Sequence, residues 1–309
     1  ALGHLDRLVR EHPRSELLPD ASLASGEAAF VMKDYARARR AYSEAASVKE
    51  GEARLRGFMG LGWCAFATGA WKEAEKWFRT ALSESAPGRI REGARARLGD
   101  ALFNQKRYAD AEEHYRACVA GAEEVYARWA QLQSGWCEYR LGRPEEARRH
   151  WDQLRRRWPS SPEAPLALQA SAETFFQQER YQEAVERYRE LLRGLPADSP
   201  AAESAALRVG DCLYNARDYQ GAVLAYRDFA GRYPGSGRLT EALYGIQWAY
   251  LQIGSYEEVR KEASDFLAKF PQAGLAAEVK LMIAESFRRE KKLREAAAQY
   301  RELVERYPG

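Results

Sequence analysis

One phrase recurs eight times along the 309-residue chain and constrains its fold more than any other feature. In its full form an aromatic residue is followed three positions later by alanine, and four positions after that by another aromatic residue. Self-similarity at a fixed period of this length indicates a repeat architecture. The central small residue, which we call the anchor, recurs every 36 to 38 residues, at Ala38, Ala74, Ala111, Ala147, Ala184, Ala222, Val259 and Ala296.

Each copy of the phrase is predicted to be a pair of helices. The residues three before and four after the anchor share one face of a helix. A second helical pattern precedes this one, with glycine or alanine twelve positions before the anchor in seven copies and Gln247 in the other. A residue without bulk at this position lets two helices approach closely. The fold class is therefore expected to be all-α.

The repeats resemble the tetratricopeptide repeat (TPR), whose pattern is W-x2-L-G-x2-Y…A-x3-F…P. The resemblance implies a right-handed α-solenoid of helix-turn-helix units, each packed on its neighbours. The family period is 34 residues, so these copies are about three residues longer. In that respect they are similar to bacterial envelope-associated TPR proteins. The second copy shows the family pattern best, in Phe58, Leu61, Gly62, Trp71, Ala74, Phe78, Ala81 and Leu82.

We expect a single solenoid over residues 1–309 that begins inside a repeat. The register places Ala1 at an anchor position, with Leu5 and Leu8 on the same face and Pro13 closing the helix. We therefore expect a fragment of a longer protein. The expected segments are the trailing helix of a truncated repeat at 1–13 and repeats at 14–50, 51–87, 88–123, 124–160, 161–197, 198–234, 235–271 and 272–309.

Charge and hydropathy favour neither nucleic acid nor a membrane as partner. The 48 Lys and Arg residues against 45 Asp and Glu residues give a net charge of only +3. Nucleic-acid and anionic-membrane binding usually show a basic excess. The longest uncharged stretch, 57–71, is shorter than the roughly 18 to 20 residues that cross a bilayer. We therefore expect no membrane span in this segment.

The four cysteines are expected to fill packing positions. Cys64, Cys137 and Cys212 all stand ten residues before an anchor, where other copies have small residues, and Cys118 stands where others have Ala, Leu or Phe. Buried free cysteine behaves as a small hydrophobe. Their wide spacing slightly favours a reducing, cytoplasmic compartment. The family resemblance favours the periplasm or envelope instead, so the compartment stays open.

No catalytic, metal or cofactor constellation emerges from the sequence. The four histidines show no ligand spacing and are expected to be solvated. Carboxylates alternate with basic residues along the helices, where intrahelical pairing is the ordinary explanation. We therefore expect no enzyme activity, no catalytic residue, no metal and no cofactor in this chain. The histidines are His4, His12, His114 and His150.

The TPR resemblance implies that the first helix of each pair lines a concave groove with the second, fifth, ninth, twelfth and thirteenth positions of the family repeat, counted so that the small residue twelve before the anchor is the eighth. The twelfth positions carry mostly aromatic rings, which we interpret as packing between neighbouring first helices. Acidic residues at ninth positions suggest a wet location, which favours partner binding for the tryptophans there. The ninth positions carry Glu27, Trp63, Asp100, Trp136, Glu173, Asp211, Trp248 and Glu285.

Repeats two to four are predicted to hold the principal binding surface. It would take an extended segment or an amphipathic helix of another protein. The predicted residues are Arg56, Met59, Trp63, Arg97, Asp100, Asn104, Trp129, Leu132, Gln133, Trp136 and Arg140. A second patch comprises Arg208, Asp211, Tyr214, Asn215, Tyr244 and Trp248.

The predicted function is a non-enzymatic scaffold or adaptor in a bacterial envelope-assembly, secretion, pilus or motility machine. Its partner is expected to be a protein rather than a small molecule. One alternative is the substrate-recognition arm of a larger enzyme whose catalytic domain lies outside this segment. Another is a helical repeat that binds single-stranded nucleic acid, which the acidic ninth positions disfavour because they would repel phosphate.

Overall fold

The computed structural model describes residues 15, 17–121 and 123–307, and within these ranges it contains helices and no strand. The all-α expectation is therefore confirmed for the described part of the chain. The expected helix at 1–13, with Ala1, Leu5, Leu8 and Pro13, lies outside the described residues, as do His4 and His12.

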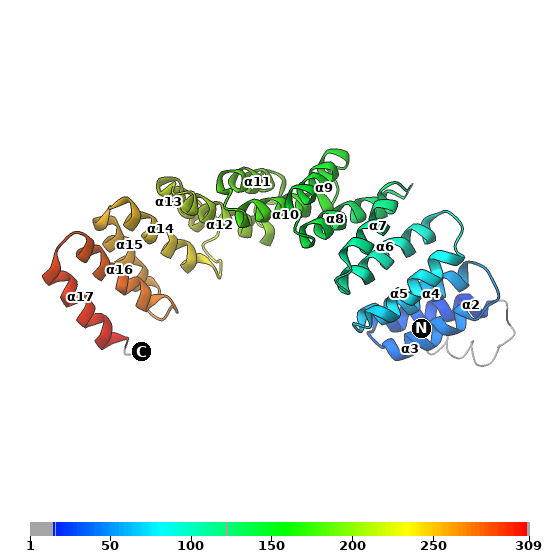
Figure 1. The fold of residues 1–309 in the computed structure, drawn as a ribbon. Helices are drawn as coiled ribbons and strands as arrows, with labels where there is room; N and C mark the ends of the chain where they lie inside the picture. The colour runs from blue at the N-terminus through cyan, green and yellow to red at the C-terminus, as the bar shows by residue number, and fades with distance from the viewer. Residues whose placement is uncertain (1–14, 16, 122, 308–309) are drawn as a thin grey trace. The chain divides into compact units, whose positions relative to one another are not determined.

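Sixteen α-helices follow one another in eight consecutive pairs within the described residues (Figure 1). Each pair lies inside one of the eight expected repeat segments, whose limits remain a prediction. The first helices are α2 (Leu18–Val31), α4 (Glu52–Ala67), α6 (Arg89–Asn104), α8 (Glu124–Arg140), α10 (Glu163–Gln177), α12 (Pro200–Asn215), α14 (Leu239–Ile253) and α16 (Ala276–Arg289). The second helices are α3 (Tyr35–Ala46), α5 (Trp71–Glu84), α7 (Tyr108–Val119), α9 (Pro144–Arg157), α11 (Tyr181–Gly194), α13 (Tyr219–Arg232), α15 (Tyr256–Lys269) and α17 (Leu293–Arg306).

The turn inside every pair has the same geometry. One residue takes a positive φ, and the next backbone N–H donates to the carbonyl five residues earlier, as in the third repeat, where Arg107 N donates to Leu102 O over 3.0 Å. This is the Schellman ending of a helix. The residue with the positive φ is glycine in three turns and a lysine, glutamate or arginine in the other five. The eight residues are Lys33, Gly69, Lys106, Gly142, Glu179, Arg217, Gly254 and Lys291.

In the five repeats with glycine twelve positions before the anchor, that glycine lies against the aromatic ring four positions after the anchor. A Cβ added at Gly99 would lie 2.7 Å from the ring of Tyr115, so a larger residue has no room there. The seventh repeat reverses the sizes: Gln247 replaces the small residue and Ala263 the aromatic one, and both are fully buried. The combined volume of the two facing side chains is thus kept roughly constant, as close packing requires.

The chain divides into two compact units, residues 1–164 and 165–309, with the division inside α10. In the first unit, α2, α4, α6 and α8 pack on one another in succession, and α3, α5 and α7 each pack on the next first helix. In the second unit, α12 packs on α14 and α14 on α16. Among the described ranges, no helix is both long and apolar enough to cross a bilayer.

Candidate protein-binding site

The predicted principal surface lies wholly in the first unit, on three successive first helices. Helix α4 carries Arg56, Met59 and Trp63; α6 carries Arg97, Asp100 and Asn104; α8 carries the other five residues. Helix α4 packs on α6 and α6 on α8, so the three helices lie side by side, and we call the surface formed by the accessible predicted residues the first-helix face of repeats two to four. Four of the residues are in direct contact: Trp63, Arg97, Asp100 and Trp129.

The carboxylate of Asp100 is the centre of this contact group. Its side chain is buried, at 7% exposure. Oδ1 accepts hydrogen bonds from the Tyr115 hydroxyl at 2.7 Å and from Trp129 Nε1 at 3.0 Å. Oδ2 accepts from Arg97 Nη1 at 2.6 Å. The buried negative charge is thus paired and hydrogen-bonded, as burial of a carboxylate requires.

Arg97 lies between two indole rings. Its Cζ is 4.8 Å from the ring centroid of Trp63 and 5.8 Å from that of Trp129. Both distances are within the range of cation–π attraction. The stack of Trp63, Arg97 and Trp129 therefore connects α4, α6 and α8. Asp100 holds the stack in place by accepting hydrogen bonds from Arg97 and Trp129.

The acidic residues at four of the ninth positions join the two helices of their repeat, a role that the sequence interpretation missed. In four repeats the ninth-position carboxylate accepts a hydrogen bond from the tyrosine hydroxyl fifteen residues later in the same repeat. The interpretation of these positions as wet is therefore wrong for Asp100, which is buried. The pairs are Tyr115–Asp100 (2.7 Å), Tyr188–Glu173 (2.9 Å), Tyr226–Asp211 (2.9 Å) and Tyr300–Glu285.

Trp63 and Trp136 make the aromatic counterpart of the same contact. Trp63 packs edge-on against Phe78 with ring centroids 5.9 Å apart, and Trp136 packs against Trp151 at 5.2 Å. Both Trp63 and Trp136 are half-buried. Each therefore contributes to the contact between the two helices of its repeat and also leaves part of its ring at the surface.

Leu132 does not belong to the exposed surface, contrary to the sequence prediction. Its side chain is 3% exposed, and its carbonyl accepts from Trp151 Nε1 at 3.2 Å. Leu132, the fifth position of the family repeat, thus faces the interior of its own repeat. Asp100 is likewise too buried to contact a partner directly, so its role is to hold Arg97 and Trp129.

The remaining predicted residues are accessible to different degrees. Arg56, Asn104 and Arg140 are exposed, while Met59 and Gln133 are half-buried. The Asn104 amide is turned back onto its own helix and donates to the Asp100 carbonyl over 2.9 Å. Arg56 pairs with Glu27 of the preceding repeat at 2.9 Å. The exposed charge on this face is therefore carried mainly by guanidinium groups.

The twelfth-position aromatic rings pack, as expected. In five repeats the ring lies edge-on to the first aromatic residue of the second helix in its own repeat. The short turn between the helices causes this, because it brings the two positions together. Phe176 also lies under Arg208 of the following first helix, with Cζ 4.5 Å from the ring centroid. The centroid distances are 5.5 Å for Phe30–Tyr35, 4.8 Å for Phe66–Trp71, 5.2 Å for Phe103–Tyr108, 5.5 Å for Phe176–Tyr181 and 5.3 Å for Tyr214–Tyr219.

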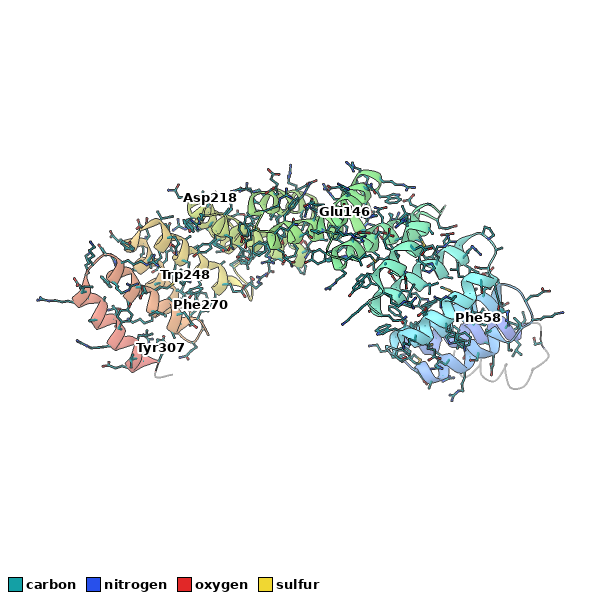
Figure 2. All side chains as sticks on the ribbon, viewed as in Figure 1. Phe58, Glu146, Asp218, Trp248, Phe270 and Tyr307 are labelled. Atoms are coloured by element: carbon teal, nitrogen blue, oxygen red, sulfur yellow. The ribbon has the colours of Figure 1, made fainter. Side chains whose placement is uncertain are left out.

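The second predicted patch, in the unit 165–309, contains two separate contact groups. Arg208 Nη2 donates to both carboxylate oxygens of Glu173, at 2.9 and 2.7 Å, and Arg208 Nη1 lies 3.6 Å from Asp211 Oδ2. Asn215, on the same helix, donates to the Asp211 carbonyl at 2.7 Å. The other group is Tyr244 and Trp248, whose rings meet edge-on with centroids 6.1 Å apart. Figure 2 labels Trp248. Tyr214 packs on Tyr219, as given above.

The predicted packing role of the cysteines is confirmed, whereas the predicted solvation of the histidines is wrong where it can be assessed. All four thiols are buried, and burial raises the pKa of Cys64 to about 11. His114 and His150 are half-buried, and burial lowers the pKa of each imidazole. His114 lies on α7, which packs on α8, and the ring of His150 on α9 lies beside Gln131 of α8, so neighbouring helices shield both rings.

These features define a class of protein: an α-solenoid built from short-turn helix pairs. Comparison with protein families identifies the pairs. A tetratricopeptide repeat model matches residues 23–90, 132–199 and 170–237, and further tetratricopeptide repeat models match 93–120 and 278–309. The chain belongs to the tetratricopeptide repeat family.

Solved structures agree on the fold at low sequence identity. The C-terminal part of a TPR protein from Cytophaga hutchinsonii has a TM-score of 0.64 at 16% identity, over 83% of this chain and 98% of that one. The apo form of RapI has 0.61 at 11%, over 94% and 97%. The apo quorum sensor NprR from B. thuringiensis has 0.54 at 16%, over 99% and 95%. No curated protein matches the chain.

Proposed function

We propose that this chain is a non-enzymatic scaffold that binds a segment of another protein on the first-helix face of repeats two to four. The family and fold are those of protein-interaction repeats. The observation that carries the placement is the stack of Trp63, Arg97 and Trp129, which spans three repeats and is held by Asp100.

Two physical arguments support a binding role for this stack. Tryptophan and arginine are the residue types that most often dominate binding free energy at protein interfaces. The stack is also ordered before any partner arrives, because hydrogen bonds and ring contacts fix its members. Preorganisation of this kind reduces the entropy lost on binding.

The occupant that fits best is an extended peptide or an amphipathic helix of a partner protein. Its apolar side chains would contact the half-buried rings of Trp63, Trp129 and Trp136, and its polar groups would meet Arg56 and Arg140 at the edges. The scaffold would serve in a bacterial envelope-assembly, secretion, pilus or motility machine. The long repeat period, which resembles that of bacterial envelope-associated TPR proteins, favours this setting.

The absence of enzyme activity is part of the proposal and has a chemical argument. Burial raises the pKa of the Cys64, Cys118, Cys137 and Cys212 thiols, which disfavours the nucleophilic thiolate. The best-placed carboxylate of the binding face, Asp100, already accepts three hydrogen bonds. Neither group is therefore poised for covalent or general-base chemistry.

Site-specific photo-crosslinking tests the placement. A photoreactive amino acid replaces Asn104 or Arg140, which are exposed on first helices, and in matched controls replaces Glu113 or Arg149, which are exposed on second helices. In lysate of the source organism we expect one protein to be crosslinked from the first pair of positions and not from the second. Equal crosslinking from both pairs, or crosslinking from the second helices alone, would refute the placement.

A second arm tests the stack itself. Introducing Trp63→Ala and Trp129→Ala together into the Asn104 crosslinking protein should abolish the crosslink. Trp158→Ala, which removes a half-buried indole at the end of α9, should leave it intact. Circular dichroism confirms that each variant folds. Titration with a single-stranded oligonucleotide at two salt concentrations tests the nucleic-acid alternative, which predicts salt-dependent binding that the double variant loses.

A further inference from the structure

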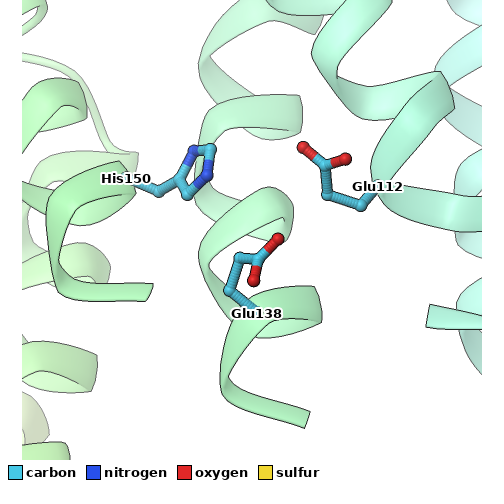
Figure 3. Close-up of side chains that lie close together, drawn as sticks. All are labelled: Glu112, Glu138 and His150. Atoms are coloured by element: carbon cyan, nitrogen blue, oxygen red, sulfur yellow. The ribbon is translucent and has the colours of Figure 1, made fainter. Parts of the chain in front are cut away.

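Three ionisable side chains from three different helices meet away from the binding face. Glu112 lies on α7, Glu138 on α8 and His150 on α9, and one potential ligand atom of each lies within 4.8 Å of the other two (Figure 3). None of the three takes part in the stack of Trp63, Arg97 and Trp129. We propose that Glu112, Glu138 and His150 form a binding site for one divalent transition-metal ion, with Zn²⁺ the best chemical match.

The two carboxylates are held close together in an unusual environment. Glu112 is 4% exposed and Glu138 is 7% exposed, so both are largely removed from water. Two buried negative charges at this separation repel each other and need positive charge nearby. A divalent cation between them would supply that charge at a single point.

In the metal-free chain, arginines supply the compensating charge from the solvent side. Arg116 pairs with Glu112, with Nε 3.0 Å from Oε1, and Arg143 Nη1 lies 3.3 Å from Glu138 Oε2. The two arginine side chains remain 72% and 60% exposed. Because their guanidinium groups are already largely in water, they can turn outward and open a path for an incoming ion.

The imidazole supplies the ligand that an acidic cluster alone would lack. The ring of His150 is half-buried, and neutral imidazole is the commonest metal ligand in proteins. Gln131 holds the ring from the other side: its Nε2 lies 3.0 Å from His150 Nδ1 and 3.2 Å from Gln153 Oε1. The second ring nitrogen is directed toward the carboxylates (Figure 3).

Metal binding requires one local change at this histidine. With the Gln131 amide donating to Nδ1, the neutral imidazole carries its proton on Nε2. If the amide turns so that its oxygen accepts a hydrogen bond from Nδ1–H, the Nε2 lone pair becomes free for the ion. This turn gives up the hydrogen bonds from Gln131 Nε2 to the His150 carbonyl at 3.0 Å and to Gln153 Oε1 at 3.2 Å, which the metal–ligand bonds would have to outweigh. The proton moves from one ring nitrogen to the other, so the neutral histidine neither gains nor loses a proton overall.

The donor set points to zinc rather than calcium or magnesium. One imidazole nitrogen and two carboxylate oxygens suit Zn²⁺, which leaves a fourth tetrahedral position for water. Calcium and magnesium prefer oxygen ligands throughout. Ligand distances of about 2 Å from Zn²⁺ would require the three side chains to close in by about an ångström. The bound ion would tie α7 of the third repeat to α8 and α9 of the fourth.

Calorimetric titration of the full chain with ZnCl₂ near neutral pH tests the site directly. We expect one high-affinity ion per chain and a rise in the melting temperature, because an ion that binds only the folded state stabilises it. His150→Gln and Glu138→Gln should each weaken binding by more than about tenfold and remove the thermal shift. Titration with Co²⁺ should give the absorption bands of a tetrahedral site in the parent only.

The matched control is His114→Gln, which removes the other half-buried histidine of the described chain while leaving the three proposed ligands in place. It should bind zinc like the parent. No measurable zinc binding by the parent would overturn the proposal. So would binding that survives in both His150→Gln and Glu138→Gln, since the ion would then sit elsewhere. Glu138→Gln keeps the shape of the side chain, so it decides the matter if His150→Gln fails to fold.

Discussion

The hydroxyl of Tyr115 donates a hydrogen bond to Oδ1 of Asp100 over 2.7 Å, joining the two helices of the third repeat in its interior. Tyr115 is fully buried and Asp100 is 7% exposed. The same contact recurs in the fifth, sixth and eighth repeats, whereas the second and fourth join the corresponding positions by aromatic rings. The choice at the ninth position is therefore coupled to the residue fifteen positions later.

Removing the Asp100 carboxylate should destabilise the chain more than removing its counterpart at the last repeat. Asp100→Ala leaves the buried Tyr115 hydroxyl without its acceptor, which should cost about 1–3 kcal/mol. Glu285→Ala removes the acceptor of Tyr300, which is only half-buried, and should cost less than about 1 kcal/mol. Urea denaturation followed by circular dichroism measures both. An equal loss in the two variants would contradict the assigned role of burial.

Much of the fold was predictable because the anchors repeat every 36 to 38 residues and the small residue lies twelve positions upstream of most of them. The pairing of Asp100 with Tyr115 could also be predicted from the sequence. Every acidic ninth residue is followed fifteen residues later by tyrosine, whereas no ninth-position tryptophan is followed by tyrosine at that spacing. The contact of Trp129 with Asp100 could not be predicted in this way, because it depends on how one repeat packs on the next. The cluster of Glu112, Glu138 and His150 joins three helices at spacings that match no ligand motif.

Alanine should be harmful at one helical glycine of the second unit and helpful at another. A Cβ at Gly210 in α12 would lie 2.4 Å from the Tyr226 ring, so Gly210→Ala should cost about 1–3 kcal/mol. A Cβ at Gly231 in α13 meets nothing within 4 Å. Gly231→Ala should therefore stabilise the chain by about 0.5–1 kcal/mol. Thermal denaturation of both variants distinguishes tight packing from general helix propensity, which predicts stabilisation at both sites.

Gln247 should be replaceable by an apolar residue with a gain in stability. Its side chain is fully buried, and neither amide atom has a hydrogen-bond partner among the described residues. Burial of an unpaired amide costs about 1–3 kcal/mol. Methionine has a similar length and no such cost, so Gln247→Met should raise the free energy of unfolding by about 1 kcal/mol. Gln220→Met, at an exposed position of α13, is the control and should change little. A loss of stability in Gln247→Met would show that the amide is satisfied.

The four thiols should react slowly with a disulfide reagent while the chain is folded. Burial raises the pKa of Cys64 to about 11 and those of Cys118 and Cys212 to about 12, and raises that of Cys137 as well. The reactive thiolate is therefore scarce, and the sulfur atoms are shielded. Spectrophotometric titration should detect all four thiols in guanidinium chloride and almost none within the same time in buffer. Rapid reaction of one thiol in buffer would locate a segment that opens readily.

The pair of Arg208 and Glu173 should make stability depend on acidity in a predictable direction. Burial tends to raise the pKa of Glu173, but hydrogen bonds from Arg208 and Tyr188 outweigh it and lower the pKa below its ordinary value. A lowered carboxyl pKa stabilises the folded state above the unfolded value, and this contribution is lost as the pH falls through the folded value. Asp211, whose pKa is raised by burial, contributes with the opposite sign.

Arg208→Met should separate these two effects. Without the guanidinium, burial dominates at Glu173, so its pKa should rise above the ordinary value. The variant should be less stable than the parent near neutral pH, and it should lose less stability when the solution is acidified toward pH 4. Urea denaturation at both acidities measures the difference, with Arg189→Met, an exposed arginine on α11, as the control that should follow the parent. If Arg208→Met lost as much stability on acidification as the parent, the ion pair could not be the origin of the acid sensitivity.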